Sequence, residues 1–278
     1  MNYRHIYHAG NFADVIKHCI VLSIIEALKR KSTPFCVLDT HAGIGLYSLY
    51  SPEAQKKREY QQGTAKLFST QMSSDTPDIM KQYLAILHQM NPNNNLNFYP
   101  GSPLLILKSI RHFDRLIASE LHEEDVYTLK QATLSYENSV IHSMNGYHAM
   151  KAFLPPKEAR GVVLIDPPFE KTTEFSDIIK HLKLALKSWR GGVYAIWYPL
   201  KENDAVKMFY SELKSLGFPV HIVETTLQHS TNPSGLNACG VAIINAPWQL
   251  PELLTDTLLP FLSQVLGIHF TNSSYSAS

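Results

Sequence analysis

Gly161-Val-Val-Leu-Ile-Asp166-Pro-Pro-Phe169 is the stretch that decides the fold of this chain. Its apolar run, residues 162–165, is typical of a strand buried on both faces of a sheet. Sheets of this kind bind ligands at the carboxyl ends of their strands, where Asp166 stands. Since Asp and Pro are also common turn residues, a plain turn explains the motif equally well when it is taken alone.

The chemistry of this motif suits an exocyclic amine on a flat ring. The Asp166 carboxylate and the Pro167 carbonyl can each accept one N–H, and Phe169 can stack on the ring. Two such acceptors favour a more tetrahedral nitrogen, whose lone pair can then attack a methyl group. The carboxylate also stabilises the positive charge that develops on that nitrogen.

Further strands and helices follow along the chain and predict a doubly wound α/β sheet. Strand-like runs cover residues 35–39, 96–99, 115–120, 139–142, 192–197, 219–224 and 240–245. Helical periodicity covers residues 11–31, 175–189 and 203–216, and Asn11 is a suitable cap for the first of these helices. The polar stretch 51–97 differs in character and is a candidate insertion, whereas residues 272–278 are expected to be frayed.

Composition excludes several classes of protein. The chain has 278 residues, 45% of them hydrophobic and only 18% charged, with a net charge of +1, so it is not a polybasic protein. Its three cysteines form no C-x-x-C pair, which argues against a zinc ribbon or a disulfide framework. The first residues lack the apolar segment of a signal peptide, and no apolar stretch is long enough to span a bilayer. We therefore expect a cytoplasmic protein with no membrane partner.

A glycine turn follows the first strand in Asp39-Thr-His-Ala-Gly-Ile-Gly45. The third glycine of a dinucleotide site is missing, because Ser48 stands in its place. The turn therefore suits a nucleoside without a pyrophosphate, such as S-adenosylmethionine, better than NAD. Glu120, at the end of its own strand, could accept both ribose hydroxyls of such a ligand, or it could be a solvated strand end.

Six motifs in a fixed order resemble one family. They are residues 3–18 (Tyr-Arg-His-x-x-His-Ala-Gly-Asn-x-Ala-Asp-Val-x-Lys-His), 38–45, 99–103 (Tyr-Pro-Gly-Ser-Pro), 119–122, 164–169 and 195–199. In this order they resemble the RlmJ family of 23S ribosomal RNA adenine-N6 methyltransferases. The resemblance runs from Asn2 to Trp248, and the opening motif is its most specific part.

The resemblance implies a class I, Rossmann-like methyltransferase with a mostly parallel seven-stranded sheet and a helical insertion after the first strand. The catalytic domain would comprise residues 1–50 and 97–278, and the insertion residues 51–96. It implies S-adenosylmethionine as methyl donor, 23S ribosomal RNA as partner and Asp166 as catalytic carboxylate. We also expect a monomer. The implied cofactor contacts are His18, His41, Ser102, Glu120, Asn145 and Gly146. The implied substrate contacts are Tyr3, His5 and Lys17, which join Pro167 and Phe169 of the strand-end motif.

The chain departs from the family pattern at two positions. Asn145 stands where the family usually has Asp; its oxygen can still accept from an adenine amine, but it carries no charge. Ala246 stands where the family tends to have a second proline, in Asn245-Ala-Pro-Trp248. We interpret that segment as the turn after the last strand.

Histidines and basic residues have alternative explanations. His18, on the first helix, is a cofactor contact by resemblance, but it could equally be a satisfied polar core residue. The 13 histidines and three cysteines form no zinc-ligand spacing, so no metal is expected.

RNA would be bound by local charge, and the candidate basic residues lie at positions 56–58 and 66 of the insertion and at 180, 183, 187 and 190 of a later helix. Basic residues of this kind usually lie on the solvent-exposed face of a helix and bind no nucleic acid.

Three other functions remain open at this point. A DNA adenine or protein glutamine methyltransferase can use a related motif at a strand end, although no separate DNA-recognition domain is visible. A non-catalytic RNA-binding protein could keep a methyltransferase fold. An NAD-dependent oxidoreductase is disfavoured by the missing third glycine.

Overall fold

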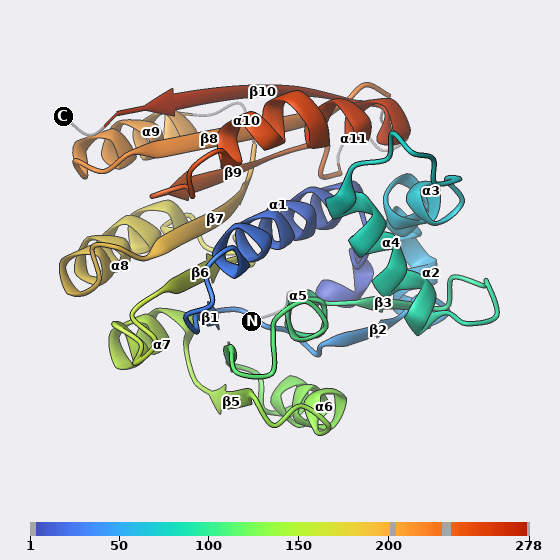
Figure 1. Cartoon of the computed structure of the whole chain (residues 1–278), viewed down its shortest axis with the longest axis horizontal. Helices are drawn as coiled ribbons and strands as arrows, with labels where there is room; N and C mark the ends of the chain where they lie inside the picture. The colour runs from blue at the N-terminus through green and yellow to red at the C-terminus, as the bar shows by residue number, and fades with distance from the viewer. Residues whose placement is uncertain (1–3, 201–203, 230–234, 277–278) are drawn as a thin grey trace.

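The computed structural model describes residues 4–200, 204–229 and 235–276. Its main strands are β1 (Cys36–Asp39), β4 (Arg115–Glu120), β5 (Ser139–Ser143), β6 (Gly161–Ile165), β7 (Val193–Pro199), β8 (Val220–Leu227), β9 (Ala238–Ile244) and β10 (Ile268–Tyr275). Among the described residues they form one eight-stranded sheet in the order β10-β8-β9-β7-β6-β1-β4-β5 (Figure 1). Two short strands, β2 (Leu46–Ser48) and β3 (Phe98–Pro100), pair separately.

The middle of the sheet is parallel. Strand β1 pairs with β4 and β6, β4 with β5, and β6 with β7, all in parallel. Strand β9 then runs antiparallel between β7 and β8. The expected class I, Rossmann-like methyltransferase fold is confirmed, with eight strands rather than seven, because β10 adds to the outer edge of β8.

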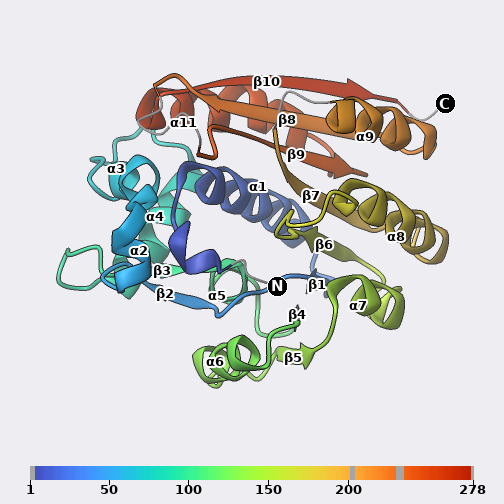
Figure 2. The ribbon, with the colours of Figure 1, turned by 180° about the vertical axis from the view of Figure 1, so that it is seen from behind.

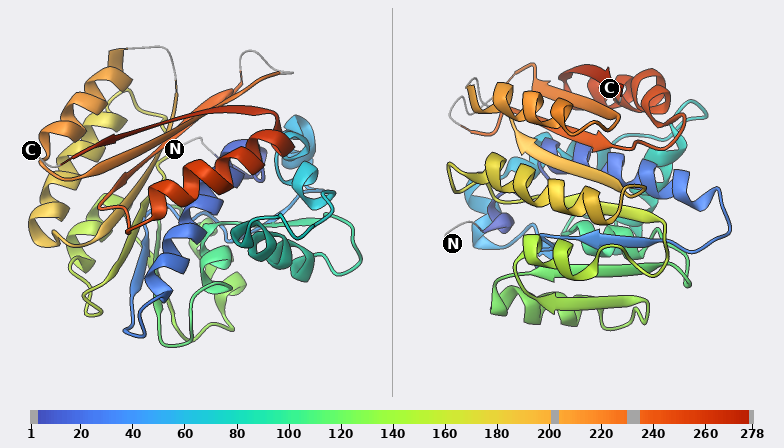
Figure 3. Two further views of the ribbon diagram at one scale, coloured as in Figure 1. Left: turned by 45° about the horizontal axis from the view of Figure 1, so that its top comes forward. Right: turned by 90° about the vertical axis from the view of Figure 1, so that its left-hand side faces the viewer.

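Helices cover both faces of the sheet. One face carries α1 (Phe12–Lys29), α5 (Ser102–Leu107), α6 (Glu123–Thr133), α10 (Leu250–Leu253), the π-helix η3 (Leu254–Leu258) and α11 (Leu259–Leu266). The other face carries α7 (Gly146–Phe153), α8 (Glu174–Ser188) and α9 (Asp204–Ser215), and Figure 3 shows these two layers. Along β6, Val162 and Leu164 pack into the first layer, while Val163 and Ile165 pack into the second. This alternation is what a strand buried on both faces requires.

Helix α1 begins where the sequence predicts. The side chain of Asn11 accepts a hydrogen bond from the backbone N–H of Asp14 at 2.8 Å and caps the helix. Most residues of α1 are buried, because the helix lies between the sheet and the helices outside it. No helix in the described part of the chain is both long and apolar enough to cross a membrane.

The stretch between β2 and β3 contains α2 (Pro52–Lys57), η2 (Glu59–Gln62), α3 (Thr64–Phe68) and α4 (Asp78–Met90). Of these helices, α4 and η2 contact α1, and α2, α3 and α4 gather on one side of the molecule in both opposite views (Figures 1 and 2). The Sγ of Cys19 in α1 lies 3.6 Å from the Sδ of Met80 in α4. Buried side chains of α4 thus belong to the same core as α1. The division into a catalytic domain and a subdomain at residues 51–96 stays a prediction.

The end of the chain differs from expectation. Residues 272–275, expected to be frayed, belong to β10, which pairs antiparallel with β8 from Ile268 to Tyr275. Asn245 does begin a turn: its φ is 54° and its Nδ2 donates to the carbonyls of Arg190 and Gly192, both at 2.8 Å. The turn follows β9, however, and not the last strand.

Candidate active site

A cavity of about 1150 Å³ opens at the carboxyl ends of β1, β4 and β6. The predicted site residues that the structure describes all line it: His5, Lys17, His18, His41, Ser102, Glu120, Asn145, Gly146, Asp166, Pro167 and Phe169. Tyr3 lies outside the described residues, so its contact with substrate stays a prediction. Residues from the opening motif and from the ends of five strands, β1, β3, β4, β5 and β6, thus meet at one place. Their individual roles remain proposals.

The glycine turn after β1 brings backbone close to the cavity. Gly43 has a φ of 62°, and a Cβ added there would lie 2.2 Å from the Tyr47 hydroxyl oxygen. Only glycine fits this conformation and this spacing. Burial lowers the pKa of His41, in the same turn, to about 4, so its ring is neutral near pH 7.

Glu120 is held rigidly at the end of β4. Its Oε2 accepts from the backbone N–H of Gly43 at 2.9 Å. Its Oε1 accepts from the backbone N–H groups of Leu121 and His122, at 2.7 and 3.0 Å. The carboxylate therefore connects the glycine turn to the end of β4, which contradicts the alternative of a freely solvated strand end.

Asn145 caps helix α7. Its Oδ1 accepts from the backbone N–H groups of Tyr147 and His148, at 2.9 and 3.3 Å. Both lone pairs of that oxygen are thereby used, so it is not available to a ligand amine as the sequence led us to expect. A ligand would instead meet the amide nitrogen, a donor. Gly146 follows, where an added Cβ would lie 2.2 Å from the carbonyl oxygen of Thr40.

His18 packs against Tyr99. Its Nδ1 lies 2.8 Å from the Tyr99 hydroxyl, and the two rings stack with their centroids 5.7 Å apart. Burial, and next the Lys17 charge, lower the pKa of His18 to about 3, so the ring is neutral. The hydrogen bond is that of a satisfied core residue, yet the ring also lines the cavity. The two interpretations of His18 are therefore compatible.

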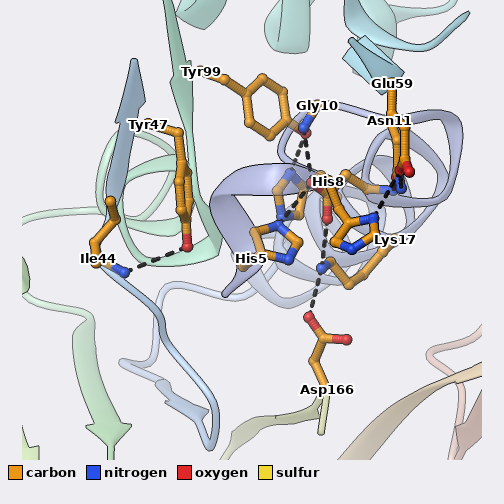
Figure 4. Close-up of polar contacts among 12 residues, drawn as sticks. His5, His8, Gly10, Asn11, Lys17, Ile44, Tyr47, Glu59, Tyr99 and Asp166 are labelled. Atoms are coloured by element: carbon orange, nitrogen blue, oxygen red, sulfur yellow. Dashed lines mark hydrogen bonds and ion pairs between the residues drawn. The ribbon is translucent and has the colours of Figure 1, made fainter. Parts of the chain in front are cut away.

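Asp166 is engaged by a lysine from helix α1. The Nζ of Lys17 lies 2.5 Å from Oδ2 of Asp166 (Figure 4). It also lies 2.8 Å from Oδ1 of Asp14. Burial alone would lower the pKa of Lys17, but the two carboxylates raise it well above its ordinary value. Lys17 is therefore a cation, and Oδ1 is the oxygen of Asp166 that is left for a ligand.

An aromatic wall stands beside Asp166. Phe169 contacts Phe175 and Trp197 edge-on, with ring centroids 5.0 and 6.0 Å apart. Phe169 also has a φ of 50°, a left-handed conformation that is uncommon for an aromatic residue. Such backbone strain is found most often at functional sites.

Sequence reasoning missed several residues of the cavity. Asp14 lies inside the opening motif but received no role, and Arg4, Tyr47 and Lys171 also line the walls. Lys57, one of the candidate RNA contacts, lines the cavity as well. The available signal for Asp14 was its place in the opening motif, three residues before Lys17. Lys66 and Lys183, candidate RNA contacts, donate to the carbonyl of Leu266 and to Glu212, each at 2.8 Å, and their contact with RNA stays a prediction. Within the described ranges, no three His, Cys, Asp or Glu side chains are placed to hold a metal ion.

Comparison with known proteins places these features in a family. A family model described as "Ribosomal RNA large subunit methyltransferase D, RlmJ" matches residues 32–276. The match extends beyond Trp248, where the motif resemblance had been expected to end.

Two curated relatives are both named ribosomal RNA large subunit methyltransferase J. The one from Haemophilus influenzae is 35% identical over 98% of this chain and 96% of its own length. The one from Escherichia coli K12 is 34% identical over 96% and 94%. A crystal structure of protein LPL1258 from Legionella pneumophila is similar with a TM-score of 0.88 and 30% identity, covering 97% of this chain and 99% of that one.

Proposed function

Because this chain belongs to the family described as ribosomal RNA large subunit methyltransferase RlmJ, we propose that it methylates the N6 amine of a specific adenine in 23S ribosomal RNA with S-adenosylmethionine as donor. The observation that carries this proposal is the place of Asp166. Its carboxylate stands at the cavity end of β6 beside Pro167, Pro168 and Phe169, which all line the same cavity.

The residues of the cavity fit S-adenosylmethionine, which supplies an electrophilic methyl group on sulfur. Glu120 presents a carboxylate, fixed by three backbone N–H groups, for the ribose hydroxyls. The tight approach of Gly146 to the Thr40 carbonyl keeps side-chain bulk out of that wall. His18, His41 and Ser102 complete the proposed cofactor contacts together with Asn145.

Asp166 and its neighbours would hold the substrate amine. Lys17 engages Oδ2 of Asp166, so Oδ1 accepts one N–H of the amine while the Pro167 carbonyl accepts the other. The carboxylate stabilises the positive charge that develops on nitrogen as it is methylated. Phe169 stacks on the adenine, which must first leave its helical stack at a cost of a few kcal/mol.

Replacing Asp166 tests this mechanism. Asp166→Asn keeps the shape but removes the charge, and Asp166→Ala removes both; each should lower kcat by at least about a hundredfold. Tritium transfer to unmethylated 23S ribosomal RNA measures kcat, and titration with S-adenosylhomocysteine should give an affinity within about twofold of wild type. Wild-type turnover in either variant would contradict the assigned role.

Other substrates are separated by the same assay. Tritium transfer to DNA or to a protein glutamine, without transfer to RNA, would favour the alternative methyltransferases. Binding of RNA without binding of S-adenosylmethionine would favour a non-catalytic protein. Mass spectrometry of ribosomal RNA nucleosides from cells with and without this protein identifies the product.

The remaining expectations form part of the same proposal. The enzyme would act as a monomer in the cytoplasm, where ribosomal RNA is made, and would need no metal. The helices at residues 51–96 would act as a subdomain that contributes Lys57 to the rim of the cavity.

A further inference from the structure

Asp14 is a buried carboxylate that the proposed reaction does not yet use. Its side chain is only 3% exposed. Its Oδ2 accepts from the backbone N–H of Gly10 at 2.9 Å and lies 2.9 Å from Nε2 of His5. Its Oδ1 lies 2.8 Å from Nζ of Lys17. Asp14 therefore joins three parts of the opening motif at one point, and its partners His5, Gly10 and Lys17 are labelled in Figure 4.

Lys17 creates a problem for the proposed chemistry. Its side chain is 5% exposed, so solvent screens its charge weakly. An ammonium in contact with Asp166 would cancel the charge of that carboxylate and would repel the positive charge that develops on the substrate amine. Lys17 can fix the orientation of Asp166 without opposing the reaction only if a second anion offsets it.

We propose that Asp14 is a positioning residue that holds Lys17 and offsets its charge, so that Asp166 still presents a net negative charge to the substrate amine. This inference rests on the proposed function. The ammonium contacts both carboxylates, and together the three groups keep one negative charge. Lys17 then acts as a hydrogen-bond donor that orients Asp166, and it does not act as an uncompensated cation.

A structural role is the competing explanation. Asp14 lies in the first turn of α1, and its bond to Gly10 N–H could simply fix the chain before the helix. Asp14→Asn separates the two roles, because the amide oxygen can still accept from Gly10 while the charge is lost. If Asp14 acts through Lys17, its replacement matters only while Lys17 is present.

The test is a double-mutant cycle of Asp14→Asn and Lys17→Met, read as kcat for transfer to 23S ribosomal RNA. Asp14→Asn alone should lower kcat by at least about tenfold, with the KM for S-adenosylmethionine and the affinity for S-adenosylhomocysteine changed by less than about twofold. In the Lys17→Met background the same substitution should change kcat by less than about twofold. Equal losses in both backgrounds would overturn the inference.

The controls keep the result interpretable. Asp78→Asn removes an exposed carboxylate that pairs with Lys81 at the same spacing of three residues in α4, and it should leave kcat unchanged. If Asp14→Asn alone does not fold, the double variant is compared with Lys17→Met, and a further loss above about twofold overturns the inference. A wild-type protein that transfers no methyl group to RNA defeats the proposed function itself, and the inference with it, whereas an active wild type with equal losses defeats only the inference.

Discussion

Asp39 is a fully buried carboxyl group at the end of β1, directly before the cavity-lining Thr40. Its Oδ1 accepts from the backbone N–H of His41 at 3.3 Å, and its Oδ2 has no hydrogen-bond partner in the part of the chain that the structure describes. Burial, together with the nearby Asp166 charge, raises the pKa of Asp39 to about 7. The folded protein therefore favours the protonated form of this group.

Asp39→Asn should change how stability depends on pH. Between about pH 4 and pH 7 the folded wild type binds a proton that the unfolded chain has lost, so its free energy of unfolding falls as the pH rises. Asparagine does not titrate. The free energy of unfolding of the variant, relative to that of wild type, should therefore be higher at pH 8 than at pH 5, by on the order of a few kcal/mol. Urea unfolding of both proteins at the two pH values measures this gain. An exposed control, Asp204→Asn, should show none, and an equal difference at both pH values for Asp39→Asn would contradict the raised pKa.

Strand β10 matters at the scale of elements, because it covers an edge of the sheet. It pairs with β8 along its whole length, and Ile268 at its start is fully buried. Without β10, β8 would present unpaired N–H and C=O groups to solvent and to other molecules. The end of the chain is thus a paired strand of the sheet and is not frayed.

A chain that ends at Gly267 should therefore be less stable and more prone to aggregate. The loss of the buried Ile268 side chain alone removes about 2 kcal/mol, and the loss of the strand pairing adds to this. Thermal unfolding and light scattering, compared with a control chain that ends at Tyr275, measure the effect. Equal unfolding temperatures for the two truncated chains would show that β10 contributes nothing.

The whole molecule carries a net charge of only +1, so any attraction of RNA depends on where charge is placed. Arg4, Lys57 and Lys171 line the cavity and come from the opening segment, the insertion and the loop before α8. Arg4 forms ion pairs with Glu124 and Asp125, and exposed pairs of this kind are weak enough to be exchanged for phosphate.

Salt should weaken RNA binding far more than cofactor binding. If these three residues contact single-stranded RNA, the logarithm of the RNA affinity should fall against the logarithm of salt concentration with a slope of about −2, since each phosphate contact contributes about −0.7. Fluorescence anisotropy with labelled RNA measures the slope, and S-adenosylhomocysteine affinity should scarcely change. Lys57→Ala should reduce the slope by about 0.7, unlike Lys207→Ala, a control on the exposed surface of α9. Equal slopes in both variants would exclude Lys57 as a phosphate contact.

Local sequence signals determined the main strands of the sheet and the start of the first helix. The apolar run at 162–165 and the Asn11 cap predicted β6 and the start of α1, because burial on both faces and capping depend on neighbouring residues. The strand-like runs at 162–165 and 115–120 placed Asp166 and Glu120 at strand ends. Parallel strands end at one edge of a sheet, so these side chains could be expected to meet.

Contacts between distant residues decided the rest. Residues 268–275 are too polar to signal a strand by themselves, and they become β10 only because β8 offers its free edge. The position of Asn145 did not reveal that its oxygen would cap α7. Asp14 is linked to Asp166 only because the fold brings Lys17 against Asp166, 149 residues further along the chain. The sequence alone thus determined which chemical groups stand at strand ends, whereas the tertiary structure decided which charges face one another, since charge compensation depends on distance in space and not on spacing along the chain.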